Sequence, residues 1–295
     1  MALTEMIQAP AEVLDGATRM GAVQLTVADA ARSVDFYQQV LGLQLQEQRH
    51  GWAALGVGGA NLVELVEMTG ARQVRNHSGL YHFAILVPSR VALAHVLRNL
   101  IQHEIQIGGS DHLVSEALYF SDPDGNGIEV YRDRPRAEWQ YEKGKPILGG
   151  LPLDYQGILR ELGAGSSPQQ EGLQLEPTTV MGHVHLHVSN LAAAVDFYCN
   201  VVGFELIMDW NQASFISAGG YHHHLGLNTW AGVGAPPLPA DAVGLRHYEI
   251  VLATREEKQR LIERLTQSGV AYEEQDNGLS VRDPAGNGIL FTVSI

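Results

Sequence analysis

The stretch Val34–Gly42 reads VDFYQQVLG, and it returns 161 residues later as VDFYCNVVG in Val195–Gly203. A second motif, DPDGNGI in 122–128, returns at the same offset as DPAGNGI in 283–289. Two motifs matched at one offset are hard to obtain by chance. The 295-residue chain is therefore interpreted as an internal duplication.

Each half of the duplication divides again. The strand-like stretch GAVQLTV in 21–27 precedes a helix pattern in which Val34, Tyr37 and Leu41 share one face, and short strand patterns follow it. The same order recurs three more times, with the DP-x-G-N turn placed before the last strand of the second and fourth copies. The sequence predicts four βαβββ modules, at about 20–68, 79–132, 181–230 and 244–294.

The modules group into two halves joined by a linker. We expect an N-terminal half in 1–134 and a C-terminal half in 179–295, each holding two modules. Residues 135–178 are rich in Pro and Gly and carry one short helix pattern, DYQGILREL in 154–162.

Composition excludes several classes of function. No stretch approaches the ~18 apolar residues that a membrane span needs. With a net charge of −14 and no block of Lys or Arg, the chain lacks the charge that nucleic acid or an anionic membrane would require. The single Cys199 cannot form an intramolecular disulfide, and the N-terminal stretch shows no signal-peptide pattern. We therefore expect a cytoplasmic protein.

Histidine is the informative residue type, because the chain holds 13 His. In GHVHLHV, His183, His185 and His187 alternate with apolar residues, so a strand would place the three imidazoles on one face. The same alternation sets His82 and Glu129 apart from the apolar residues beside them. These side chains are predicted to line a cup rather than to pack under a helix.

The βαβββ module, the DFY…G helix and the DP-x-G-N turn together resemble the vicinal-oxygen-chelate superfamily. That superfamily includes glyoxalases, fosfomycin- and bleomycin-resistance proteins and extradiol dioxygenases. Four modules in about 300 residues, and the residues that make up the motifs, most resemble bacterial catechol 2,3-dioxygenases. The resemblance implies an α+β fold whose four modules pair into two open barrels.

In that family one barrel cups a metal. The ligands come from the first strand of one module and from the first and last strands of its partner. Two His and one carboxylate on one face of an octahedron are typical of Fe(II) sites that keep positions open for substrate and O2. We expect Fe(II), with Mn, Ni or Zn as alternatives.

Counting ligand positions selects the pair of modules. In module order, the first-strand position holds Ala22, His82, His183 and His247. The last-strand carboxylate position holds Glu129 in the second module but Leu290 in the fourth. Only the second and third modules together complete a set. We therefore predict that His82, Glu129 and His183 hold the metal, and that the barrel formed by the first and fourth modules is empty.

The resemblance also implies residues around the metal. Tyr119 lies ten residues before Glu129, as the family's tyrosine does, and His112 fits the family's upstream histidine if a two-residue deletion is allowed. The family's acid/base histidine falls in the His222-His223-His224 run, where the register favours His223 and strand parity leaves its two neighbours open. Whether His185 approaches the metal stays open as well.

The resemblance implies an extradiol ring-cleaving dioxygenase that acts on catechol or a substituted catechol with O2. His223 would serve as general base and then general acid, while His112 and Tyr119 would hydrogen-bond the substrate oxygens. Three alternatives are weighed: a glyoxalase-like lyase or isomerase using Ni or Zn, a fosfomycin-type transferase, and a non-catalytic protein that binds an aromatic compound or drug. The chain lacks an evident basic cluster for a phosphonate, which disfavours the transferase. The sequence leaves the substrate and any homo-oligomer undefined.

Overall fold

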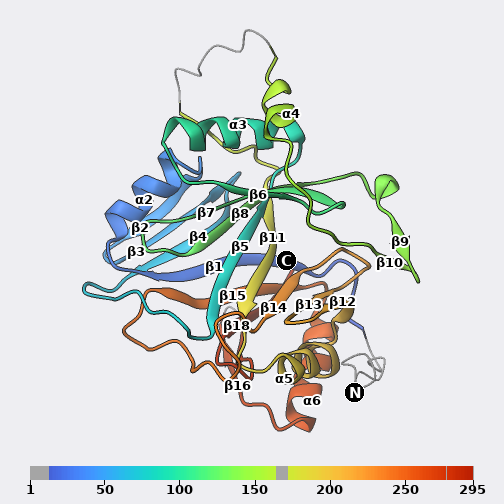
Figure 1. Cartoon of the computed structure of the whole chain (residues 1–295). Helices are drawn as coiled ribbons and strands as arrows, with labels where there is room; N and C mark the ends of the chain where they lie inside the picture. The colour runs from blue at the N-terminus through green and yellow to red at the C-terminus, as the bar shows by residue number, and fades with distance from the viewer. Residues whose placement is uncertain (1–12, 164–171, 277, 295) are drawn as a thin grey trace. The chain divides into compact units, whose positions relative to one another are not determined.

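The computed structural model describes residues 13–163, 172–276 and 278–294. Within them the order βαβββ occurs four times, which confirms the predicted α+β fold class (Figure 1). No helix of the described part is long and apolar enough to cross a membrane.

The first half of the chain holds two modules. Asp29 and Ser89 cap the starts of its two helices, since the side chain of each accepts a backbone N–H of the first turn. The elements of the first module are β1 (Arg19–Val27), α2 (Ala30–Gln39), β2 (Gln44–Arg49), β3 (Trp52–Val57) and β4 (Ala60–Glu67). Those of the second are β5 (Gly79–Leu86), α3 (Arg90–Gln102), β6 (Gly108–Asp111), β7 (Ser115–Ser121) and β8 (Gly127–Asp133).

The second half repeats this order with one local difference. In the third module the helix changes from α-helical to π-helical hydrogen bonding, whereas its counterpart α2 is α-helical throughout. The third module comprises β11 (Val180–His187), α5 (Leu191–Asp196), the π-helix η2 (Phe197–Val202), β12 (Glu205–Trp210), β13 (Ala213–Ser217) and β14 (Leu225–Asn228). The fourth comprises β15 (Gly244–Leu252), α6 (Arg255–Gln267), β16 (Tyr272–Gln275), β17 (Gly278–Arg282) and β18 (Gly288–Val293).

The linker contains the short helix that the sequence predicted, α4 (Tyr155–Arg160), which packs beside α3 (Figure 1). A short 3-10 turn, η1 (Arg136–Glu138), and a small hairpin of β9 (Tyr141–Glu142) and β10 (Lys145–Pro146) precede it. Linker residues 164–171 lie outside the described residues.

Strand order shows which modules share a sheet. One eight-stranded sheet runs β12-β13-β14-β11-β5-β8-β7-β6, and the other runs β16-β17-β18-β15-β1-β4-β3-β2. The second module therefore shares a sheet with the third, and the first with the fourth, as counting ligand positions predicted. A side-chain contact supports the second pairing, because Ala22 on β1 donates its backbone N–H to Glu249 on β15 at 3.1 Å.

The described chain separates into two compact units. The C-terminal unit contains the described residues of Met1–Gln24, Arg72–Tyr81 and His183–Ile295, and the N-terminal unit contains those of Leu25–Ala71 and His82–Gly182. Each unit therefore holds most of one half of the chain.

The two repeated motifs bind each other within each unit. In the N-terminal unit, Tyr37 of the DFY motif donates its hydroxyl to Asp122 of the DP turn at 2.9 Å. Asp122 also accepts the backbone and side-chain N–H groups of Asn126. Burial raises the pKa of the Asp122 carboxyl and raises the pKa of Tyr37 well above its usual range. The motifs recur together because one supplies the donor and the other the buried acceptor.

The C-terminal unit repeats this anchor with an extra member. Tyr198 donates its hydroxyl to Asp283 at 3.0 Å, and its oxygen also lies 2.7 Å from the hydroxyl oxygen of Tyr248. Burial raises the pKa of the Asp283 carboxyl, as it does for Asp122.

A charged cluster fixes strand β7 in the N-terminal unit. Glu116 is buried and accepts hydrogen bonds from Arg90 on α3 at 2.9 Å and from Arg132 on β8 at 2.7 Å. Burial alone would raise the pKa of Glu116, but the two guanidinium groups outweigh it and lower the pKa. The cluster holds β7 against the helix, and Tyr119 lies on the same strand.

Candidate metal centre

The first two predicted ligands lie on neighbouring parallel strands. His82 comes from β5 and Glu129 from β8, where Ala84 and Glu129 are register partners. The Nε2 atom of His82 lies 3.0 Å from a carboxylate oxygen of Glu129. Both side chains are buried, with residue exposures of 6% and 2%. A buried carboxylate is costly unless it is paired or bound to a metal.

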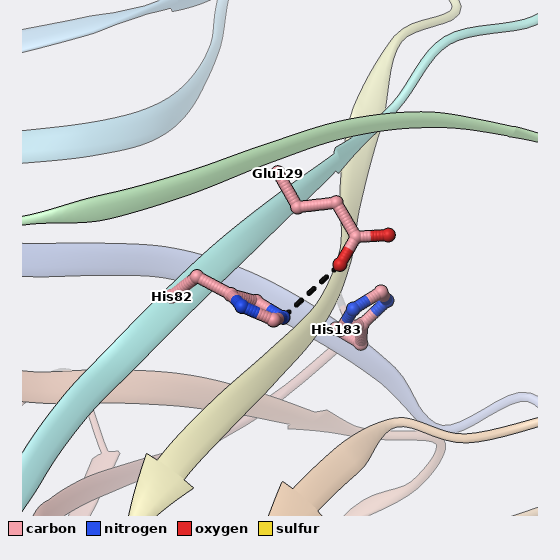
Figure 2. Close-up of side chains that lie close together, drawn as sticks. All are labelled: His82, Glu129 and His183. Atoms are coloured by element: carbon pink, nitrogen blue, oxygen red, sulfur yellow. Dashed lines mark ion pairs between the residues drawn. The ribbon is translucent and has the colours of Figure 1, made fainter. Parts of the chain in front are cut away.

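His183 on β11 completes the group. One ligand atom from each of His82, Glu129 and His183 can be chosen so that all three lie within 4.8 Å of one another. Figure 2 shows the three side chains converging, with the dashed line between His82 and Glu129. Among the described residues this is the one cluster of at least three potential metal donors that meets this distance criterion.

The donor set fits a divalent transition metal. Two imidazole nitrogens and one carboxylate oxygen, all buried, match the ligand types that Fe(II), Mn, Ni and Zn accept. Three protein ligands leave further coordination positions for a substrate. His247 and Leu290, which occupy the matching positions of the fourth module, form no such cluster within the described chain.

Tyr119 and His112 lie together beside this group. Tyr119 on β7 is the register partner of Glu129, and its ring centre lies 5.5 Å from that of His82. The Nε2 atom of His112 lies 2.6 Å from the Tyr119 hydroxyl. The Nδ1 atom of His112 lies 2.7 Å from the carbonyl oxygen of Gly149, a linker residue that the sequence reasoning did not single out.

The histidine run lies in a loop rather than in the strand that was expected. β14 begins at Leu225, so His222, His223 and His224 precede it, and strand parity does not apply to them. The ring centre of His223 lies 4.1 Å from that of His183, compared with 6.2 Å for His222. The Nδ1 atoms of His222 and His223 are 2.8 Å apart, so one of them donates to the other.

His224 has a different environment. Its Nδ1 atom accepts the backbone N–H of Ala218 at 3.2 Å and lies 2.9 Å from the hydroxyl oxygen of Ser217. Both contacts use Nδ1 of His224, whereas Nδ1 of His223 contacts His222. Its side chain is therefore engaged with the neighbouring strand β13 and the residue that follows it.

His185 belongs to an aromatic row, not to the ligand cluster. Its ring lies 5.7 Å from Phe215, 5.4 Å from Trp230 and 5.1 Å from Tyr81, measured between ring centres. Gly226 is the register partner of both His185 and Phe215, and a Cβ atom there would lie 2.7 Å from the His185 ring. A glycine inside a strand pattern is the sequence signal that points to such a close approach.

Comparison with known proteins agrees with this fold. The model of the Glyoxalase/Bleomycin resistance protein/Dioxygenase superfamily matches residues 19–130 and 180–291. A Bacillus subtilis (strain 168) protein named catechol-2,3-dioxygenase is 42% identical over 283 residues, which cover 94% of this chain and 98% of that protein.

Two solved structures share the fold at low sequence identity. A candidate dioxygenase from Bacillus subtilis subsp. subtilis str. 168 matches with a TM-score of 0.65 and 14% identity, covering 96% of this chain and 86% of that one. Glyoxalase I from Zea mays matches with a TM-score of 0.56 and 14% identity, covering 94% and 92%. With its duplicated modules matched twice by one family model, the chain belongs to the Glyoxalase/Bleomycin resistance protein/Dioxygenase superfamily.

Proposed function

We propose that this protein is an extradiol ring-cleaving dioxygenase that uses a divalent metal, Fe(II) in our assignment, to open catechol or a substituted catechol with O2. The observation that carries the proposal is the buried cluster of His82, Glu129 and His183. A relative named catechol-2,3-dioxygenase, 42% identical over nearly the whole chain, supports the same reaction.

We assign His82, Glu129 and His183 to hold the metal. The chemistry that a bound divalent metal supplies is acidification of the two diol hydroxyls and activation of O2. His82 and Glu129 come from the paired parallel strands β5 and β8, so the sheet rather than a loop fixes the spacing of these two ligands. A scaffold of this kind limits how far these two side chains must move when the metal binds.

His223 is the proposed general base and acid. Its ring lies beside that of His183, and His222 orients it through the contact between their Nδ1 atoms. In this role His223 accepts a proton from one diol hydroxyl and later returns it to the product. His112 and Tyr119, which lie between His82 and Glu129 in the sequence, are proposed to hydrogen-bond the substrate oxygens.

A glyoxalase-like lyase or isomerase is the second candidate, because the fold is shared with Zea mays glyoxalase I. That class usually carries a fourth metal ligand, which is a carboxylate. The ligand cluster found among the described residues contains Glu129 as its single carboxylate. A non-catalytic protein that binds an aromatic compound is the third candidate. We place the reaction in the cytoplasm and expect no nucleic-acid or membrane partner, as the sequence predicts.

Activity tests the assignment directly. Protein purified without oxygen and loaded with about one Fe(II) per chain should consume O2 and form a yellow ring-opened product with at least one member of a panel of catechols. The measurement is O2 uptake together with absorbance of the product. No turnover across the panel, at verified iron content, would favour the lyase or the binding protein.

The acid/base role is tested by His223→Ala. We expect this variant to keep its metal and to lose about 10²–10⁴-fold in turnover, the usual contribution of a general acid–base group. His222→Ala and His224→Ala are the matched neighbours in the same loop. Full activity of His223→Ala, with loss in either neighbour, would transfer the role to that neighbour.

A further inference from the structure

The contacts of His112 determine which of its nitrogens carries the proton. A carbonyl oxygen can only accept, so the 2.7 Å contact with Gly149 requires that Nδ1 of His112 donates. In the neutral ring, Nε2 then has no hydrogen and acts as an acceptor. At 2.6 Å from Nε2, the Tyr119 hydroxyl must be the donor in that contact.

Gly149 is held in place for this task. Its backbone N–H donates to the carbonyl oxygen of His112 at 3.2 Å, so Gly149 and His112 exchange two hydrogen bonds. Leu151 and Asp111 exchange a further pair of backbone bonds, each of 2.9 Å, next to them. The linker is therefore paired with the β6–β7 hairpin at this point.

The Leu113 side chain lies close to Gly149, so a larger residue at position 149 would have to displace it. A Cβ atom at position 149 would lie 2.9 Å from a methyl carbon of Leu113, shorter than real Cβ contacts. Leu113 itself adopts a left-handed backbone conformation, with φ of 70°, at the turn of the hairpin. At the adjacent Gly150 a Cβ atom would meet nothing closer than 3.9 Å.

We propose that the Gly149 carbonyl fixes His112 as its Nδ1–H form, so that His112 and Tyr119 act as one proton-accepting relay rather than as two separate donors. This rests on the proposed function for the identity of the proton donor, a substrate hydroxyl. In the relay the substrate O–H bond breaks as a new O–H bond forms on Tyr119. The original Tyr119 proton moves to Nε2 of His112.

The charge balance of this step is complete. The substrate is left as an anion, and His112 becomes an imidazolium whose two N–H groups both have acceptors, Gly149 and Tyr119. No oxidant or further reactant is needed. The relay gives the site a second proton acceptor, separate from His223, and Gly149 is a positioning residue within it.

The first test needs no turnover. In the full chain loaded with diamagnetic Zn²⁺, NMR of ¹⁵N-labelled imidazoles should show His112 with a protonated Nδ1 and an unprotonated Nε2. The signals are assigned by their loss in His112→Asn. Tyr119→Phe should leave the same form in place, since Gly149 sets it. A protonated Nε2 in the neutral ring of the unaltered chain would overturn the proposal.

Gly149→Ala tests the positioning role, with Gly150→Ala as its matched control. We expect Gly149→Ala to give a mixture of both His112 forms, Gly150→Ala to give the form of the unaltered chain, and Gly149→Ala with Leu113→Ala to recover it. A mixture of both forms in Gly150→Ala as well would contradict a specific role for the carbonyl at position 149.

Kinetics separate a relay from two independent donors. If His112 and Tyr119 act as one unit, the double variant His112→Asn with Tyr119→Phe should match the more impaired single variant in kcat/KM to within about twofold. Losses that multiply would refute the relay. If no catechol is turned over, the proposed function fails, while the NMR result still decides the form of His112.

Discussion

The second and fourth modules have the same strand pairing but carry different side chains at the equivalent positions. In the second, Ala84 and Glu129 are register partners across parallel strands; in the fourth, Glu249 and Leu290 take those places. The carboxylate of this pair therefore lies on the last strand, β8, in the second module and on the first strand, β15, in the fourth. Glu249 accepts the hydroxyl of Thr292 at 2.6 Å and the backbone N–H of Ala22, so protein donors satisfy it.

The comparison shows how little separates a donor cluster from an ordinary sheet. His247 stands where His82 stands, yet Leu290 and Ala22 provide no ligand atoms around it. Tyr119 is likewise replaced by Ser280, the register partner of Leu290. Duplication preserves the fold because packing is repeated, whereas the site depends on a few positions that packing does not constrain.

The largest expected effect is loss of metal when a predicted ligand is removed, compared with removal of the equivalent histidine in the fourth module. His82→Ala and His183→Ala should each lose the bound iron, because two remaining ligands rarely hold a labile Fe(II) against water. His247→Ala should keep about one iron per chain, since its module supplies no partner ligands. The measurement is iron content after anaerobic loading. An empty His247→Ala beside a loaded His82→Ala would move the site to the fourth module.

An intermediate effect concerns the two buried tyrosine–aspartate hydrogen bonds, Tyr37 with Asp122 and Tyr198 with Asp283. Tyr198→Phe should lower the free energy of unfolding by about 1–3 kcal/mol, because it removes a hydrogen bond from the buried Asp283 carboxyl and another from Tyr248. Tyr37→Phe should cost less, since its hydroxyl serves Asp122 alone among the contacts found. Urea titration of both variants measures the difference. A larger loss in Tyr37→Phe would contradict this ranking.

The smallest effect depends on pH. Glu116 has a lowered pKa in the folded chain, so its pairing with Arg90 and Arg132 stabilises the fold above the ordinary glutamate pKa of 4.5. This contribution disappears as the pH falls through the lowered value. Glu116→Gln should therefore melt a few degrees below the unaltered chain at pH 7 and converge with it in acid, once the pH is below the lowered pKa of Glu116. A gap that widens in acid would show the opposite sign.

The sequence predicted much of the fold because its signals are local. The DFY and DP-x-G-N motifs identify the duplication, and strand alternation places His82, Glu129 and His183 on the faces where the structure finds them together. The pairing of the second module with the third also follows from counting positions. The roles of these residues as ligands stay predictions until metal is measured.

What the sequence could not predict depends on contacts between distant segments. Gly149 lies in a linker without a motif, and its bond to His112 arises from the path of the chain. The histidine run was expected in a strand, but the strand begins only at Leu225. Tyr81 joins the row of His185 and Trp230 through tertiary packing that no periodicity reports.

The sharing of strands between the first and fourth modules, and between the second and third, has a consequence for ancestry. Two copies of a two-module protein could build the same two sheets only as a symmetric homodimer, with each sheet combining one copy's first module and the other copy's second. Joining two such copies through residues 135–178 would give a single chain with this strand order. The two equivalent positions would then be free to differ, as Glu129 and Leu290 do.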